Sequence, residues 1–185
     1  MKCYDTNVFI NKALIDETIR NQIISDFKNK DCVLIRSIYE ELILEHFSNI
    51  SIIMHTLIFQ FERSKLELNQ FFPSPIFLEF KRNYASIAEH IENNYKKFED
   101  IKIMKDVITN IKNISMAIFA SKCFYPMYQE EYEELENNPP KEYSEMCNRV
   151  KNKDRKHLGL LEWYGTRISE KSKEPVKILF VSCDR

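Results

Sequence analysis

The chain begins Met1-Lys2-Cys3-Tyr4-Asp5-Thr6-Asn7-Val8-Phe9-Ile10. In this stretch a short apolar run ends in an aspartate, which is followed by two small polar residues and a second apolar run. The pattern predicts a buried first strand that leads through a loop into a helix. In an open α/β sheet, ligands bind outside the carboxyl ends of the strands, so Asp5 lies where a site is expected. The alternative is that Asp5 caps the helix that follows it.

Three further acids occupy comparable places in the sequence. Glu41 comes shortly after the apolar run 32–35, Asp154 begins the segment 154–161, and Asp184 ends the apolar run 176–183. Two predicted strand ends and two predicted helix starts therefore each carry a carboxylate. Oxygen ligands of this kind suit Mg²⁺, which prefers octahedral geometry and keeps several of its waters.

In their order along the chain, these segments resemble the four acidic motifs of PIN domains. The segments are Asp5-Thr6-Asn7-Val8-Phe9-Ile10, Ser37-Ile38-Tyr39-Glu40-Glu41-Leu42, Asp154 with His157-Leu158, and Phe180-Val181-Ser182-Cys183-Asp184. The resemblance covers roughly residues 1–48 and 150–185. It implies a three-layer α/β fold with a central parallel sheet flanked by helices. It also implies a hydrolase, a Mg²⁺ or Mn²⁺ dependent nuclease and most often an endoribonuclease, whose catalytic and metal-binding residues are Asp5, Glu41, Asp154 and Asp184.

Other residues near the four acids have expected supporting roles. Thr6 and Asn7 are expected to support the ligands, and the hydroxyl of Ser182 could hold a ligand carboxylate or a metal-bound water. Asp106 is an alternative third acid. Ser37 and Glu40 have the spacing of a capping box. His157 is expected to be packed or hydrogen-bonded rather than to act as a general base.

Four basic residues flank the third acid and form the strongest candidate phosphate-binding patch in the sequence. They are Lys151, Lys153, Arg155 and Lys156. The alternative is that this segment is an exposed helix junction.

The sequence pattern in the middle of the chain predicts helices. The apolar periodicity predicts helices over 14–27, from 37 to about 66, over 76–98 and over 101–124, and then a loop or broken helix over 124–140. A helix over 141–153, a helix over 155–164 that ends at Gly165, and a strand over 176–183 complete the expected order. The whole chain is expected to be one domain, 1–185, with a helical insertion at about 67–145. Aromatic side chains in the insertion could stack on bases or could be core residues, and these are Phe71, Phe72, Tyr84 and Tyr95.

The composition limits the class of protein. The chain has 185 residues, 44% of them hydrophobic, two glycines and a net charge of −1, which excludes a strongly basic nucleic-acid binder. Its five cysteines show no zinc spacing, so free thiols in a reducing compartment are expected. No signal sequence is evident, and the most apolar segment, 50–61, is shorter than the ~20 residues of a membrane span. We therefore expect a cytoplasmic protein without membrane association.

Two functions from different classes remain open at this stage. The first is an endoribonuclease that cuts single-stranded or structured RNA, including the toxin-type members of toxin–antitoxin pairs. The second is an inactive PIN-like scaffold that binds RNA or a protein partner through the helical insertion. A homodimer and a protein inhibitor or antitoxin also remain open. Because PIN domains normally continue after the fourth acid, the resemblance implies a truncated or abbreviated C-terminal end.

Overall fold

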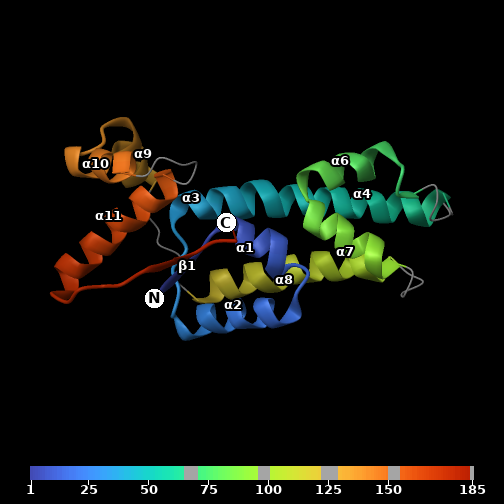
Figure 1. Cartoon of the computed structure of the whole chain (residues 1–185), viewed down its shortest axis with the longest axis horizontal. Helices are drawn as coiled ribbons and strands as arrows, with labels where there is room; N and C mark the ends of the chain where they lie inside the picture. The colour runs from blue at the N-terminus through green and yellow to red at the C-terminus, as the bar shows by residue number, and fades with distance from the viewer. Residues whose placement is uncertain (65–70, 96–100, 122–128, 150–154, 184–185) are drawn as a thin grey trace.

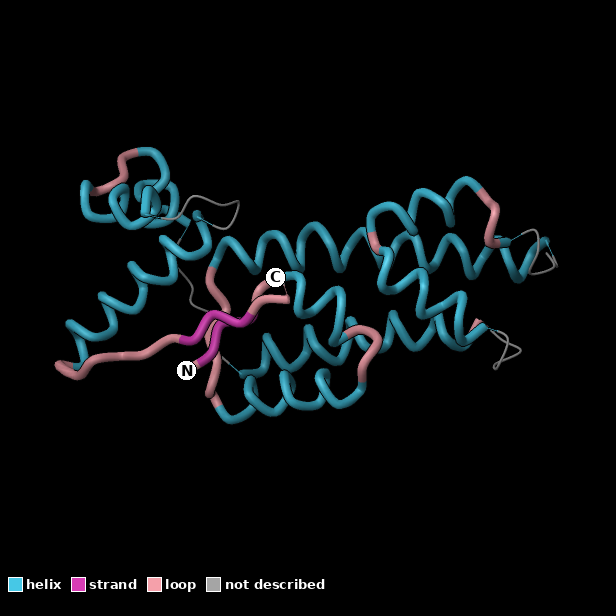
Figure 2. Tube along the Cα trace, in the orientation of Figure 1, coloured by secondary structure: helices cyan, strands magenta, loops and turns pink. Residues whose placement is uncertain are grey.

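The computed structural model describes residues 1–64, 71–95, 101–121, 129–149 and 155–183 (Figure 1). Helices dominate, with 78% helix and 5% strand. The two strands, β1 (Lys2–Tyr4) and β2 (Leu179–Val181), form a parallel pair near the middle of the molecule (Figure 2). The expected three-layer α/β fold with a central sheet is therefore wrong for the part of the chain that the structure describes.

The short strands explain this correction. β1 pairs with β2 through only three residue pairs, which include Cys3 with Phe180, and its other edge makes an isolated parallel bridge from Lys2 to Cys32. The segment after Cys32 stays buried, but Ile35 already caps the next helix, so the run is too short for a full strand. The three expected segments do meet in parallel, while most of their apolar side chains pack against helices.

One long helix runs through the molecule. It consists of α3 (Arg36–Tyr39), η2 (Glu40–Phe47) and α4 (Ser48–Ser64), and it agrees with the helix expected from 37 to about 66. Its inner face is buried at Leu42, Ile50 and Met54. By length and composition, the 28 residues from Arg36 to Arg63 could cross a membrane, a test that core helices of soluble proteins also pass.

Two helices pack beside this long helix. α8 (Lys102–Ser121) packs against both α4 and α2 (Glu17–Asn29), as Figure 1 shows. The carboxylate of Asp16 accepts hydrogen bonds from the backbone N–H groups of Thr18 and Ile19, at 2.8 and 3.1 Å, and so caps α2. Although α8 lies within the expected insertion, it therefore forms part of the main core.

The remaining helices of the expected insertion are shorter than the sequence predicts. The expected helix 76–98 is two helices, α6 (Pro75–Asn83) and α7 (Ala85–Tyr95), which are separated at Tyr84. The segment expected to be a loop or broken helix contains α9 (Gln129–Asn137), which agrees with the second alternative, and α10 (Lys141–Arg149) follows. Phe71 and Tyr84 are buried, so they are core residues and are not available to stack on bases. Phe72 is half-buried against Phe71, and the side chain of Tyr95 lies outside the described residues.

The last helix, α11 (Arg155–Ser172), packs against α10. It continues through Gly165, so the expected end of the helix at this glycine is wrong. Neither glycine of the chain has a positive φ angle. The chain then returns in extended form to β2, which places the segment after residue 176 beside the N-terminal strand (Figure 2).

Candidate functional site

Asp5 lies at the carboxyl end of β1 and is 3% exposed. Its backbone N–H donates to the carbonyl oxygen of Val181 at 2.8 Å, which ties it to β2. Asp5 occupies the N-cap position of α1 (Thr6–Val8), but its side chain makes no capping hydrogen bond. Its Oδ2 atom instead accepts hydrogen bonds from Ser182 Oγ at 2.9 Å and from Asn7 Nδ2 at 3.3 Å. The side chain therefore faces the strand ends and does not cap the helix.

Glu41 lies in η2 and meets the segment that follows Asp5. Its Oε2 atom accepts a hydrogen bond from Thr6 Oγ1 at 3.0 Å, and Nε2 of His157 lies 2.9 Å away. Because Thr6 is the residue after Asp5, the first and second acidic motifs lie next to each other. The other carboxylate oxygen, Oε1, lies 3.7 Å from Nε2 of His46, which is longer than a hydrogen bond.

These contacts keep Glu41 ionised at neutral pH. The neighbouring side chains of His157 and then His46 hold the pKa of Glu41 well below its usual range, and they outweigh partial burial, which raises it. The hydroxyl of Thr6 acts in the same direction as the histidines. The carboxylate is thus available as an anionic ligand.

The side chains of Ser37 and His157 lie next to each other, and His157 contacts Glu41. Nδ1 of His157 lies 2.8 Å from Ser37 Oγ, although the two residues are 120 positions apart in the sequence. The expected capping box is therefore wrong, since Ile35 is the N-cap of α3 and Glu40 accepts a hydrogen bond from Arg36 Nε at 2.7 Å. Ser37, His157 and Glu41 share the residue types of a hydrolase triad, but the serine is only 6% exposed and could not reach a substrate.

The site also contacts the segment between α6 and α7. Nδ1 of His46 lies 3.3 Å from the hydroxyl of Tyr84, and the two rings meet edge to face at 5.9 Å. His46 therefore lies between Tyr84 and the open oxygen of Glu41. Through this contact, part of the expected insertion touches the site.

Several expected site residues lie outside the described part of the chain. These are Lys151, Lys153, Asp154 and Asp184. Arg155 and Lys156 belong to the first turn of α11, but their side chains are likewise outside it. The expected phosphate-binding patch and two of the four acids therefore remain predictions.

The alternative third acid, Asp106, is excluded by its position. It is exposed on α8 beside Lys105, whose Nζ atom lies 3.4 Å from Glu62. Glu62 and Glu41 are separated by about 30 Å along the long helix, at a rise of about 1.5 Å per residue. Asp106 is therefore too far away to share a metal ion with Glu41.

The oxygen atoms of Asp5 and Glu41 are of the chemical type that a magnesium-type cation prefers. The described residues contain no group of three or more histidines, cysteines or acids that could enclose a metal, within the ranges given above. Mg²⁺, however, is commonly held by one or two carboxylates while its other positions keep water. The carboxylates of Asp5 and Glu41, with neighbouring hydroxyl groups, are hard oxygen ligands of that kind.

For two residues of the site, the sequence alone does not predict a role there. These are Ser37, whose spacing to Glu40 suggests a cap, and His46. His157 belongs to the third acidic motif, and this membership could have indicated a role beside the acids. The backbone also indicates a functional site here. η1 (Phe9–Ala13) and η2 are π-helical segments, which occur frequently at functional sites.

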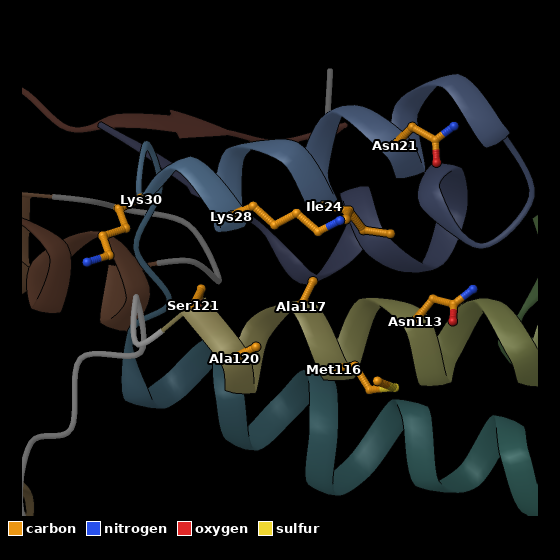
Figure 3. A pocket seen from close by; sticks show the side chains of 9 residues that line it. All are labelled: Asn21, Ile24, Lys28, Lys30, Asn113, Met116, Ala117, Ala120 and Ser121. Carbon is orange, nitrogen blue, oxygen red and sulfur yellow. The ribbon is translucent and has the colours of Figure 1, made fainter.

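A cleft of about 550 Å³ lies elsewhere, between α2 and α8 (Figure 3). None of the expected site residues lines it. Its polar side chains are spread out, with Lys30 and Asn21 at opposite ends. This cleft therefore offers no convergent set of polar groups for a ligand.

Searches with protein-family models, curated protein sequences and solved structures found no match to this chain. The PIN resemblance consequently rests on the four sequence motifs alone.

Proposed function

We propose that this protein is a metal-dependent endoribonuclease that uses Asp5 and Glu41 as metal ligands. The observation that carries the proposal is the junction of the first two acidic motifs, where Thr6, the neighbour of Asp5, donates to Glu41 at 3.0 Å. The second acidic motif thus contacts the residue next to Asp5, beside the carboxyl end of a parallel strand pair. In this proposal Asp154 and Asp184 supply the remaining acids, and Mg²⁺ or Mn²⁺ is the cofactor.

In this proposal the described residues have the following roles. Ser182 and Asn7 orient the carboxylate of Asp5, while Thr6 and His157 orient that of Glu41. A bound divalent cation supplies Lewis-acid polarisation of the phosphodiester and neutralises the charge that develops on it. Glu41 remains an anion because its hydrogen bonds favour the ionised form.

The direct test is cleavage of labelled single-stranded RNA and DNA in the presence of Mn²⁺, Mg²⁺ or EDTA. We expect RNA cleavage with either metal and none with EDTA. Asp5→Asn keeps the size of the side chain but removes the charge, so we expect at least a 100-fold loss of activity, in line with the loss of a principal charged catalytic group.

A matched variant, Asp106→Asn, removes an exposed aspartate far from the site and should leave cleavage unchanged. Comparing it with Asp154→Asn tests which residue is the third acid, and only Asp154→Asn should lose activity. Equal activity of wild type and Asp5→Asn would contradict the proposal. Cleavage of DNA alone would contradict the proposed substrate.

The second candidate function is the inactive scaffold that binds RNA or a protein partner through the helical insertion, here extended to the adjacent long helix. It is favoured by exposed apolar side chains on the long helix and α8, which are Leu44, Ile52, Phe59, Met116 and Phe119. A second copy of the chain, or an inhibitor such as an antitoxin, is the partner proposed for this surface, and a cytoplasmic location is part of the same proposal. Absence of both cleavage and Mn²⁺ binding in a folded wild-type protein would favour the scaffold over the nuclease.

A further inference from the structure

His157 is the residue that connects the last helix to the second acidic motif. It lies in the first turn of α11, and both of its ring nitrogens have polar neighbours, Ser37 at 2.8 Å and Glu41 at 2.9 Å. No other described histidine contacts both a serine and a site carboxylate. The ring is mostly buried, with 16% of its side chain exposed.

The chemistry of the partners assigns the protons on this histidine. An ionised carboxylate can only accept hydrogen bonds, so Nε2 must carry a proton and donate it to Glu41. In a neutral imidazole the second nitrogen then accepts, so the hydroxyl of Ser37 must donate to Nδ1. Glu41 therefore selects the Nε2–H tautomer, and the hydroxyl of Ser37 satisfies the other ring nitrogen.

In this arrangement the two carboxylate oxygens of Glu41 have different surroundings. Oε2 accepts from both Thr6 and His157, whereas Oε1 has Nε2 of His46 at 3.7 Å, beyond hydrogen-bond distance. With Oε2 occupied from two sides, the carboxylate cannot rotate freely. Oε1 is the oxygen left for a cation.

We propose that His157 is a positioning residue, which donates from Nε2 to Glu41, accepts from Ser37 at Nδ1 and so fixes Glu41 with Oε1 left for the metal. The inference rests on the proposed function, because it assigns a role within the same metal site. His157 takes no part in proton transfer to the substrate. Its contribution is to the affinity of the site for the metal ion.

The first measurement is nitrogen-15 NMR of the histidine rings in the full chain without added metal. We expect His157 to carry its proton on Nε2, and we expect Ser37→Ala to leave it there, because Glu41 still accepts from Nε2. A His157 ring with its proton on Nδ1 in the wild type would overturn the inference, whatever the outcome of the cleavage assay.

The second measurement is calorimetric titration with Mn²⁺ alone. Loss of an outer partner of a metal ligand typically weakens affinity about 10- to 100-fold, and we expect this for His157→Ala. His157→Gln should recover most of the affinity, because its amide can accept from Ser37 and donate to Glu41. His55→Ala removes an exposed histidine from α4 and serves as the matched control, with no change expected.

The outcomes separate the inference from the proposed function. Wild-type affinity in His157→Ala would overturn the inference while leaving the nuclease intact. Failure of His157→Gln to recover affinity, in a protein that melts like the wild type, would also overturn it. A folded wild type that binds no Mn²⁺ would overturn both.

Discussion

Asp26 is a buried aspartate that joins the first strand to α2. Its Oδ2 atom accepts hydrogen bonds from Lys2 Nζ at 2.8 Å and from the hydroxyl of Tyr4, and its Oδ1 atom accepts one from Gln22 at 2.8 Å. Hydrogen bonds that involve a charged group contribute about 1.5 to 3 kcal/mol each. We expect Asp26→Asn to lower the free energy of unfolding by about 2 kcal/mol in urea denaturation at pH 7. Asp31→Asn, at an exposed aspartate, should change it by less than about 0.5 kcal/mol.

The same residue predicts a pH dependence of stability. Burial raises the pKa of Asp26, but the hydrogen bonds from Lys2, Tyr4 and Gln22 outweigh it and leave the pKa lowered. A carboxyl whose pKa is lower in the folded state stabilises the protein above its unfolded value of about 3.9, and this stabilisation is lost as the pH falls through the folded value. The difference between wild type and Asp26→Asn should therefore be largest above about pH 5 and shrink in more acidic urea titrations. An equal difference at pH 7 and pH 3 would show that the charge of Asp26 does not matter.

At the scale of residues, the sequence predicted Thr6, Asn7 and Ser182 as supports of the acids, and their hydrogen bonds to Asp5 and Glu41 agree with this. It did not predict the pair of Ser37 and His157. Asp5 stands out because it follows an apolar run and precedes another. Ser37 does not, because its partner His157 is 120 positions away and its spacing to Glu40 has a simpler local explanation. Hydrogen bonds between distant segments leave no periodic pattern in a sequence.

At the scale of elements, the packing of α10 against α11 depends on one glycine. A Cβ atom at Gly159 would lie 2.3 Å from Cys147 Sγ and 3.1 Å from its Cα, whereas one at Gly165 would meet Ile178 at 3.6 Å. Replacing glycine by alanine inside a helix normally stabilises it by about 1 kcal/mol, while overpacking costs about 1 to 3 kcal/mol. We expect Gly159→Ala to lower stability by about 1 to 2 kcal/mol and Gly165→Ala to raise it by about 0.5 to 1 kcal/mol.

Thermal and urea denaturation of the two variants would test this difference in sign. Cys147→Ala removes the sulfur atom, so the cost of Gly159→Ala should be smaller in that background. A stabilising effect of both alanines would mean that α10 and α11 are not in close contact.

Helices were predicted better than strands, for a physical reason. A helix such as α8 buries one face along 20 residues, and this repeats every three to four positions in the sequence. The apolar runs 32–35 and 176–183 show that a segment is buried, but they do not show how much of it pairs with another strand. Pairing depends on the partner, and here only short stretches of each run find one.

At the scale of the whole molecule, the parallel pairing joins segments that are far apart in the chain. Cys3 pairs with Phe180, and Lys2 bridges to Cys32, so the N-terminal strand is held between two distant segments. The order of the acidic motifs predicted this meeting. The motifs carried no information on how many strands the intervening residues contribute, which is why the expected three-layer sheet was wrong.

This meeting of distant segments predicts that a bound cation stabilises the entire protein. The proposed ligands Asp5 and Glu41 belong to the first strand and the long helix, and Ser182 brings the C-terminal segment to Asp5. A ligand present at 100 times its dissociation constant contributes about 2.7 kcal/mol to the folded state. For a chain of this size we expect Mn²⁺ to raise Tm by roughly 5 to 11 °C.

Thermal denaturation with Mn²⁺ or EDTA measures this effect without an RNA substrate. Asp5→Asn should lose most of the Mn²⁺-dependent rise in Tm, because it removes one of the proposed charged ligands. Asp31→Asn should retain the rise, since that exposed aspartate lies outside the site. A rise of the same size in Asp5→Asn would place the bound Mn²⁺ away from Asp5, and the carboxylates of the first two motifs would then need an explanation other than metal binding.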